Sequence, residues 1–125
     1  MFTIKSLDHI AIIVKDVDVS AKWYADTIGL KKMDYEGAWG KVPLMLYSEA
    51  NNGIALFPGE PSAKGGMMHF AFLVDYPDFQ KAQDELREKG IRFVFEDHIA
   101  THSIYMRDPD GYEVELTAYN PDYSA

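Results

Sequence analysis

Two histidines begin similar segments that lie sixty residues apart in the chain. His9 begins the segment HIAIIV and His69 begins HFAFLV, with alanine and valine at the same places in both. The same offset overlays IAL at residues 54–56 on VEL at residues 114–116. The sequence therefore contains an internal repeat, with halves of about 1–60 and 65–125 joined by a linker rich in proline and glycine.

Strand alternation predicts that His9, His69 and Glu115 point to equivalent sides of their strands, because successive side chains of a strand face opposite ways. A carboxylate among apolar strand residues is costly to bury unless it is paired or bound to a metal. Two imidazoles and one carboxylate are ligands that a divalent first-row metal accepts. One histidine alone would favour an ordinary hydrogen-bonded strand residue, but the repeated pair with a glutamate favours a metal site.

The expected metal site has open coordination positions. The counterpart of Glu115 in the first half is Ala55, so a second carboxylate is missing. Two histidines and one carboxylate are typical of non-haem Fe(II) oxygen chemistry, which favours Fe(II), with Mn, Ni and Zn as alternatives. The chain has no cysteine, so nitrogen and oxygen must supply every ligand. A substrate could then chelate the metal at the open positions.

Each half is expected to hold one helix and four strands that position these side chains. Apolar spacing and a following glycine predict helices at about 18–28 and 77–89. Strands are expected near residues 4–14, 31–36, 42–48, 53–57, 67–75, 91–96, 102–107 and 112–119. The bulkier even-numbered residues of the first, fifth and last of these strands should pack under the helices. The predicted fold class is α+β, with two βαβββ modules in a single domain of residues 1–125.

Composition narrows the class of partner. The chain carries 12 Lys and Arg against 20 Asp and Glu, a formal charge of −8. This balance, without a Lys/Arg run, disfavours nucleic acid and anionic membranes as partners. No apolar stretch approaches the ~18 residues of a membrane span, and the start has no signal-peptide pattern. A cytoplasmic protein that binds a small molecule is expected.

Three segments resemble the vicinal oxygen chelate superfamily, which includes glyoxalase I, extradiol dioxygenases, fosfomycin-resistance transferases and bleomycin-binding proteins. They are LDHIAIIVKDVDVSAKWYADTIGLKK, HFAFLV and HSIYMRDPDGYEVEL, and the resemblance covers essentially the whole chain. It implies paired βαβββ modules whose cupped, mixed sheets surround a metal, often in a homodimer. His9, His69 and Glu115 match the ligand positions of the family, whereas Ala55 falls where glyoxalase I supplies an additional glutamate.

The stretch that ends at Glu115 is similar to the extradiol dioxygenase pattern. That pattern contains a histidine, an apolar–tyrosine pair, an acidic-Pro-x-Gly turn and the ligand glutamate, which correspond here to His98, Ile104–Tyr105, DPDG at 108–111 and Glu115. The resemblance implies catalytic roles for His98 and Tyr105 in positioning substrate oxygens. Strand alternation independently places Tyr105 on the pocket face. Two features depart from the pattern, namely Glu96 and the lack of a histidine in residues 50–68.

Five residues remain to be interpreted. Trp39, Met45 and Tyr47 are candidates for lining the substrate pocket, although Trp39 could instead cover a hydrophobic edge. His102 is expected to be structural because it shares the even face of its strand with apolar residues. For His98, simple solvent exposure is an alternative to a catalytic role.

Together these features predict a divalent-metal-dependent enzyme whose substrate chelates the metal through neighbouring oxygens. Extradiol-type ring cleavage is the first choice. A glyoxalase-like lyase or isomerase is the alternative, and a non-catalytic small-molecule-binding protein of the bleomycin-resistance type is another. A homodimer is expected, because the sheets would have open outer edges.

Overall fold

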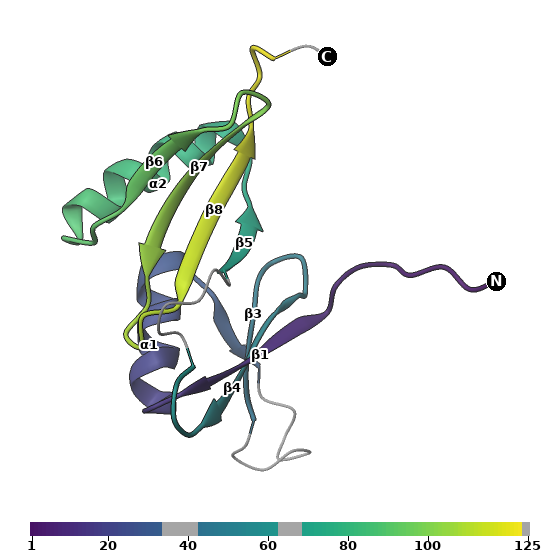
Figure 1. Ribbon diagram of the computed structural model, residues 1–125, viewed down its shortest axis with the longest axis vertical. Helices are drawn as coiled ribbons and strands as arrows, with labels where there is room; N and C mark the ends of the chain where they lie inside the picture. The colour runs from purple at the N-terminus through teal and green to yellow at the C-terminus, as the bar shows by residue number, and fades with distance from the viewer. Residues whose placement is uncertain (34–42, 63–68, 124–125) are drawn as a thin grey trace. The chain divides into compact units, whose positions relative to one another are not determined.

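A computed structural model describes residues 1–33, 43–62 and 69–123 of the chain. The chain divides into two compact units, Met1–Ser62 and Ala63–Ala125. Each unit contains a strand, a helix and then three strands (Figure 1).

The first unit is built on a four-stranded mixed sheet. Its elements are β1 (His9–Val14), α1 (Val17–Ile28), β2 (Lys31–Met33), β3 (Leu44–Tyr47) and β4 (Gly53–Pro58). The strand order is β1-β4-β3-β2, in which β1 and β4 are parallel and the other neighbours are antiparallel.

The second unit repeats this topology. Its elements are β5 (His69–Leu73), α2 (Tyr76–Glu88), β6 (Val94–Asp97), β7 (Thr101–Arg107) and β8 (Glu113–Tyr119). The strand order is β5-β8-β7-β6, again with one parallel pair, β5 with β8. The predicted α+β fold class of two βαβββ modules with mixed sheets is confirmed.

The internal repeat extends to the pairing of individual residues. Ala11 pairs with Ala55 between β1 and β4, and Ala71 pairs with Glu115 between β5 and β8. Each residue of the second pair lies sixty positions after its counterpart in the first pair. The parallel strands of the two sheets are therefore paired in the same register. A slip of one residue would have turned every side chain to the opposite face. The offset read from the sequence is therefore the structural offset as well.

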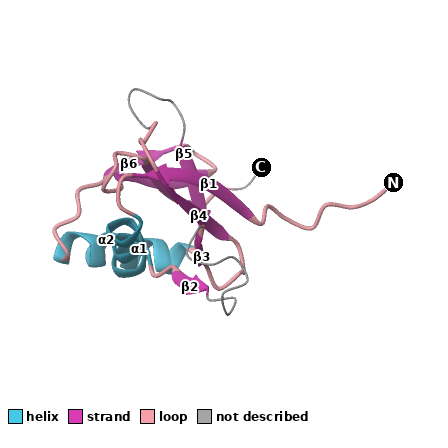
Figure 2. Cartoon of the chain, turned by 90° about the horizontal axis from the view of Figure 1, so that it is seen from below, coloured by secondary structure: helices cyan, strands magenta, loops and turns pink. Residues whose placement is uncertain are grey.

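In each unit the helix lies against one face of the sheet, with α1 on β3 and β4 and α2 on β8 (Figure 2). Tyr24 of α1 and Phe79 and Leu86 of α2 are fully buried there. In every described strand except β6 the even-numbered residues lie on this face, and the buried ones are Ile12, Val14, Leu46, Ile54, Leu56, Ile104, Met106, Val114, Leu116 and Ala118. Fully burying one such aliphatic side chain contributes roughly 1.5–3 kcal/mol. In β6 the register places Phe95 on the helix face, because it pairs with Ile104. The opposite faces carry the candidate ligands, His9 in the first unit and His69 and Glu115 in the second.

Two strands begin later than the sequence predicted. The first was expected from residue 4 but starts at His9, because its partner β4 starts at Gly53, whose amide donates to the carbonyl of Asp8 at 2.9 Å. The sixth was expected from residue 91, but the Ile91 amide donates to the carbonyl of Leu86 at the end of α2. Pairing with the neighbouring strand therefore sets the first boundary, and hydrogen bonding at the C-terminal end of α2 sets the second, rather than residue propensity. Within the described ranges, no helix is long and apolar enough to cross a membrane.

Candidate metal centre

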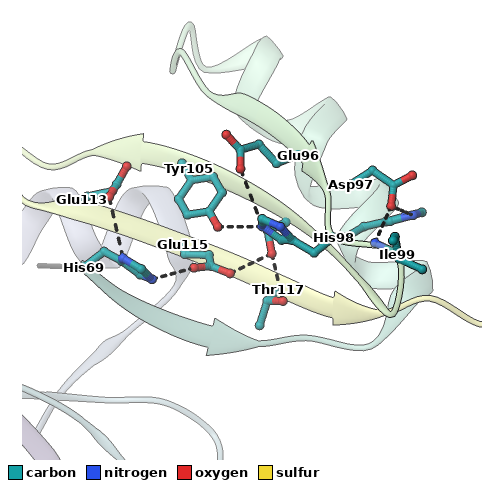
Figure 3. Close-up of polar contacts among 11 residues, drawn as sticks. His69, Glu96, Asp97, His98, Ile99, Tyr105, Glu113, Glu115 and Thr117 are labelled. Atoms are coloured by element: carbon teal, nitrogen blue, oxygen red, sulfur yellow. Dashed lines mark hydrogen bonds and ion pairs between the residues drawn. The ribbon is translucent and has the colours of Figure 1, made fainter. Parts of the chain in front are cut away.

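His69 and Glu115 form a close pair on the face of the second sheet away from α2. They come from the neighbouring strands β5 and β8, and His69 Nε2 lies 3.0 Å from Glu115 Oε1 (Figure 3). Two cis ligands of an octahedral ion with bonds of about 2.1 Å are separated by about 3 Å. The distance of 3.0 Å between the two atoms is therefore that of a direct hydrogen bond, and it is also the distance between two adjacent ligand atoms of a metal ion. The donor set, one imidazole nitrogen and one carboxylate oxygen, fits a divalent metal.

The second carboxylate oxygen of Glu115 is held separately. Ser103 Oγ donates to Glu115 Oε2 at 2.7 Å, and Thr117 Oγ1 lies 3.0 Å from Ser103 Oγ. Glu115 is buried, with 7% of its surface exposed, and Ser103 is fully buried. The carboxylate is therefore oriented by the protein, with Oε1 directed to His69.

In both units a carboxylate lies near the Nδ1 atom of the candidate ligand histidine. His9 Nδ1 is 2.8 Å from Asp8 Oδ2, and His69 Nδ1 is 3.8 Å from Glu113 Oε2. The first distance is a hydrogen bond, in which Nδ1 donates because a carboxylate only accepts, and the second is an ion-pair distance. Metal-ligating histidines characteristically use one ring nitrogen in this way and present the other to the metal. If His9 binds a metal, Nε2 is the ring nitrogen that this contact leaves for coordination.

Asp8 is a neighbour of the candidate ligand His9 that was not predicted from the sequence. Its carboxylate accepts the Nδ1 proton of His9 and also a hydrogen bond from Tyr47 Oη at 3.2 Å. The hydrogen bond from His9 is the main cause that lowers the pKa of Asp8 below its ordinary value. The available signal was an aspartate directly before a histidine at the start of a strand.

Tyr105 and His98 meet beside Glu115. Tyr105 pairs with Glu115 across β7 and β8, and His98 Nε2 lies 2.9 Å from Tyr105 Oη (Figure 3). Glu96 Oε2 is 3.7 Å from the same histidine nitrogen. Burial, followed by the negative charge of Glu115, raises the pKa of Tyr105. At neutral pH the phenol therefore keeps its proton and can donate a hydrogen bond.

The other sequence candidates have different surroundings. Met45 and Tyr47 are buried and cluster with Ala55 in the first unit, and Met45 pairs with Ala55 across β3 and β4. Trp39 lies outside the described residues. His102 contacts Tyr76 Oη through Nδ1 at 2.8 Å and Asp97 Oδ1 through Nε2 at 3.4 Å. These contacts tie α2 to the β6–β7 hairpin on the helix side of the sheet.

The three predicted ligands are divided between the units. His9 belongs to Met1–Ser62, whereas His69 and Glu115 belong to Ala63–Ala125. Among the residues that the structure describes, no group of three or more His, Asp or Glu side chains has the spacing of a metal site. Among the described residues, the candidate ligands that lie within contact distance of each other are therefore His69 and Glu115.

Known proteins similar to this chain carry different activities in their names. "Catechol-2,3-dioxygenase" of Bacillus subtilis is 29% identical over 92% of this chain and 42% of its own length. "Probable lactoylglutathione lyase" of Synechocystis is 30% identical over 86% of this chain and 91% of its own length. The chain thus spans less than half of the dioxygenase and most of the lyase.

Solved structures and family models agree on the fold. A crystal structure of a glyoxalase/dioxygenase from Nostoc punctiforme superimposes with a TM-score of 0.76 at 21% identity, covering 93% of this chain and 92% of that one. Residues 6–116 match the family model for glyoxalases, bleomycin-resistance proteins and dioxygenases. The chain therefore belongs to the Glyoxalase/Bleomycin resistance protein/Dioxygenase superfamily.

Proposed function

We propose that the protein is a divalent-metal-dependent enzyme that acts on a small molecule with two neighbouring oxygen atoms. The proposed ligands are His69 and Glu115, with His9 as the third ligand on sequence grounds. Fe(II) is the favoured ion, and Mn, Ni and Zn are the alternatives. The observation that carries the proposal is the His69–Glu115 pair, in which ligand atoms lie 3.0 Å apart and the other carboxylate oxygen is held by Ser103.

When bound, the ion supplies Lewis acidity toward substrate oxygens and, as Fe(II), a place where dioxygen and substrate meet. Glu115 would bind the ion through Oε1, the oxygen directed toward His69. Tyr105 Oη would donate a hydrogen bond to a substrate oxygen, because its raised pKa keeps the phenol protonated. His98 Nε2, at 2.9 Å from Tyr105 Oη, would exchange a proton with that hydroxyl.

Ring cleavage of a catechol-like substrate is the reaction that we favour. The His98–Tyr105 contact supports it, because a paired acid and base beside the metal suits deprotonation of an aromatic diol. A relative named as a catechol dioxygenase supports it as well. Catecholates offer the two adjacent oxygens that the proposed open metal positions require.

A glyoxalase-like lyase or isomerase is the second candidate. The relative named as a lactoylglutathione lyase favours it, since this chain covers 91% of that protein. Ala55 weighs against it, because a glutamate at this position would be needed to complete a symmetric ligand set. A non-catalytic binding protein is the third candidate, and for it the His69–Glu115 pair would be a structural hydrogen bond.

Metal analysis followed by two activity assays tests the proposal. Protein purified without chelators should contain one equivalent of a first-row metal, and His69→Ala should lose it. His102→Gln is the matched control, because His102 lies on the helix side of the sheet, and this variant should keep its metal. A metal-free wild type, or a His69→Ala variant that retains full occupancy, would contradict the proposal.

The activity assays then distinguish the two reactions. After anaerobic loading with Fe(II), oxygen consumption is measured with a panel of catechols. Isomerisation of an α-ketoaldehyde with glutathione is measured in parallel with Ni and Zn. Oxygen uptake is the expected result, whereas isomerisation alone would replace ring cleavage by the lyase assignment.

We also propose a cytoplasmic homodimer. In the first described sheet β1 and β2 are the outer strands, and in the second β5 and β6 are the outer strands. Such edges expose unpaired backbone groups that a second copy could cover. Sedimentation velocity should show twice the chain mass, and a monomer at micromolar concentration would contradict this part.

A further inference from the structure

We propose that Ser103 is a positioning residue for Glu115, and that the Thr117 hydroxyl fixes Ser103 in this role. This inference rests on the proposed function, because it concerns how a metal-binding carboxylate is oriented. Ser103 would not contact the metal or the substrate. Its role would be to select which oxygen of Glu115 remains available for coordination.

The strand register brings these three side chains together on one face of the second sheet. Ser103 of β7 pairs directly with Thr117 of β8, and the next pair on the same face is Tyr105 with Glu115. Ser103 and Glu115 are therefore diagonal neighbours, a spacing that a long side chain can bridge. Ser103 Oγ reaches Glu115 Oε2 at 2.7 Å, which is shorter than its 3.0 Å contact with Thr117 Oγ1.

A count of protons gives the chain of hydrogen bonds its direction. The Ser103 hydroxyl has one proton and two lone pairs, and an ionised Glu115 has only acceptors. Ser103 therefore donates its proton to Glu115 Oε2. The contact of 3.0 Å to Thr117 Oγ1 must then be donated by Thr117. The resulting order is Thr117 to Ser103 to Glu115.

This direction leaves Oε1 as the coordinating oxygen. One carboxylate oxygen is engaged by a fully buried hydroxyl, and the other faces His69 Nε2 at 3.0 Å. A glutamate held in this way has already lost its side-chain freedom before an ion arrives. Preorganisation of this kind improves affinity, because binding no longer has to restrict the side chain.

The first unit offers a natural contrast within the same fold. At the sixty-residue offset, Ser103, Glu115 and Thr117 correspond to Pro43, Ala55 and Phe57. None of these three has a hydroxyl or a carboxylate. The hydroxyl chain is thus present in the sheet that carries a carboxylate and absent from the sheet that lacks one.

Titration with Mn(II), followed by the electron paramagnetic resonance signal of the free ion, tests this inference. Ser103→Ala should weaken Mn(II) binding about 10–100-fold, the usual effect of removing a group that orients a metal ligand. Thr117→Val should weaken it less, because Ser103 keeps its proton for Glu115. Ser20→Ala is the matched control, since Ser20 is a fully buried serine in the other unit. The Mn(II) affinity of this variant should equal that of the wild type.

A second readout separates positioning from general destabilisation. Urea unfolding of the metal-free variants measures stability, and the crystal structure of metal-free Ser103→Ala shows the Glu115 rotamer. Wild-type Mn(II) affinity in Ser103→Ala, or an unchanged Glu115 conformation, would overturn the inference. If Glu115→Ala itself binds Mn(II) as the wild type does, the proposed function fails instead, so the two failures are distinguishable.

Discussion

The two sheets share a topology and a register but differ in the chemistry of their odd-numbered faces. In the second sheet, Glu115 pairs with Tyr105 across neighbouring strands. In the first sheet, the equivalent pair is Ala55 with Met45, both of which are buried. The carboxylate and phenol of one sheet thus correspond to an apolar pair in the other.

This difference shows that scaffold and chemistry are specified by separate residues. The even-numbered faces carry apolar side chains against a helix in both units, and they determine the fold. The opposite faces differ, and among the described residues the second sheet alone combines a histidine with a glutamate at 3.0 Å. The first retains His9, oriented by Asp8.

The equivalence of the two scaffolds predicts similar costs for matched cavities. Leu56 and Leu116 are buried at positions sixty residues apart. Truncating either to alanine should lower the free energy of unfolding by about 2–5 kcal/mol, because burial is lost and a cavity remains. Urea denaturation measures both. A cost below about 1 kcal/mol at one site alone would break the equivalence.

The difference in chemistry predicts a specific loss of metal. Glu115→Gln keeps the size of the side chain but removes a charged ligand, so Mn(II) affinity should fall by more than about 100-fold, beyond the effect of an orienting group. Glu113→Gln is the comparison, because Glu113 is 3.8 Å from His69 Nδ1 and would orient this histidine rather than bind the ion, so its loss should cost about 10–100-fold. Equal effects in a calorimetric titration would remove the distinction between the two glutamates.

Restoring symmetry should destabilise the first unit. In Ala55→Glu a carboxyl group enters the buried cluster of Met45 and Tyr47, where no serine corresponds to Ser103. An unpaired buried polar group costs about 1–3 kcal/mol. Thermal unfolding should show the loss, with Ala55→Leu as a control for volume. A fully stable Ala55→Glu would mean that the first sheet can accommodate the carboxylate.

The smallest expected effect concerns Tyr105 at alkaline pH. Its pKa is raised in the folded state, so above its ordinary value of 10.0 the unfolded chain loses this proton before the folded chain does. The contribution of Tyr105 to the free energy of unfolding is therefore complete below pH 10. It is lost as the pH rises through the pKa of Tyr105 in the folded state. Urea unfolding at several pH values between 8 and 11 should show that the free energy of unfolding falls more steeply with pH for the wild type than for Tyr105→Phe. Parallel profiles would contradict the raised pKa.

Sequence patterns predicted the features that depend on periodicity and repetition. The sixty-residue offset, the two modules and the face of Glu115 followed from apolar alternation and from matching segments, and the His98–Tyr105 association followed from a family resemblance. These features are encoded by residues at fixed spacing, so the sequence alone contains them.

Features that depend on a partner strand were harder to predict. The late start of β1 reflects the absence of a paired residue in β4 before Gly53, which propensity does not reveal. The contact of Ser103 with Glu115 was not predicted, because a single serine in a strand carries no signal by itself. Its position relative to Thr117 and Glu115 requires the register of β7 and β8.

The central claim is that His69 and Glu115 bind one divalent metal ion. Crystals grown with Mn(II) and measured near the manganese absorption edge test it most directly. We expect one anomalous peak within about 2.0–2.3 Å of both His69 Nε2 and Glu115 Oε1. The contrary result is the absence of a peak at this pair while the two atoms remain in direct contact at saturating Mn(II).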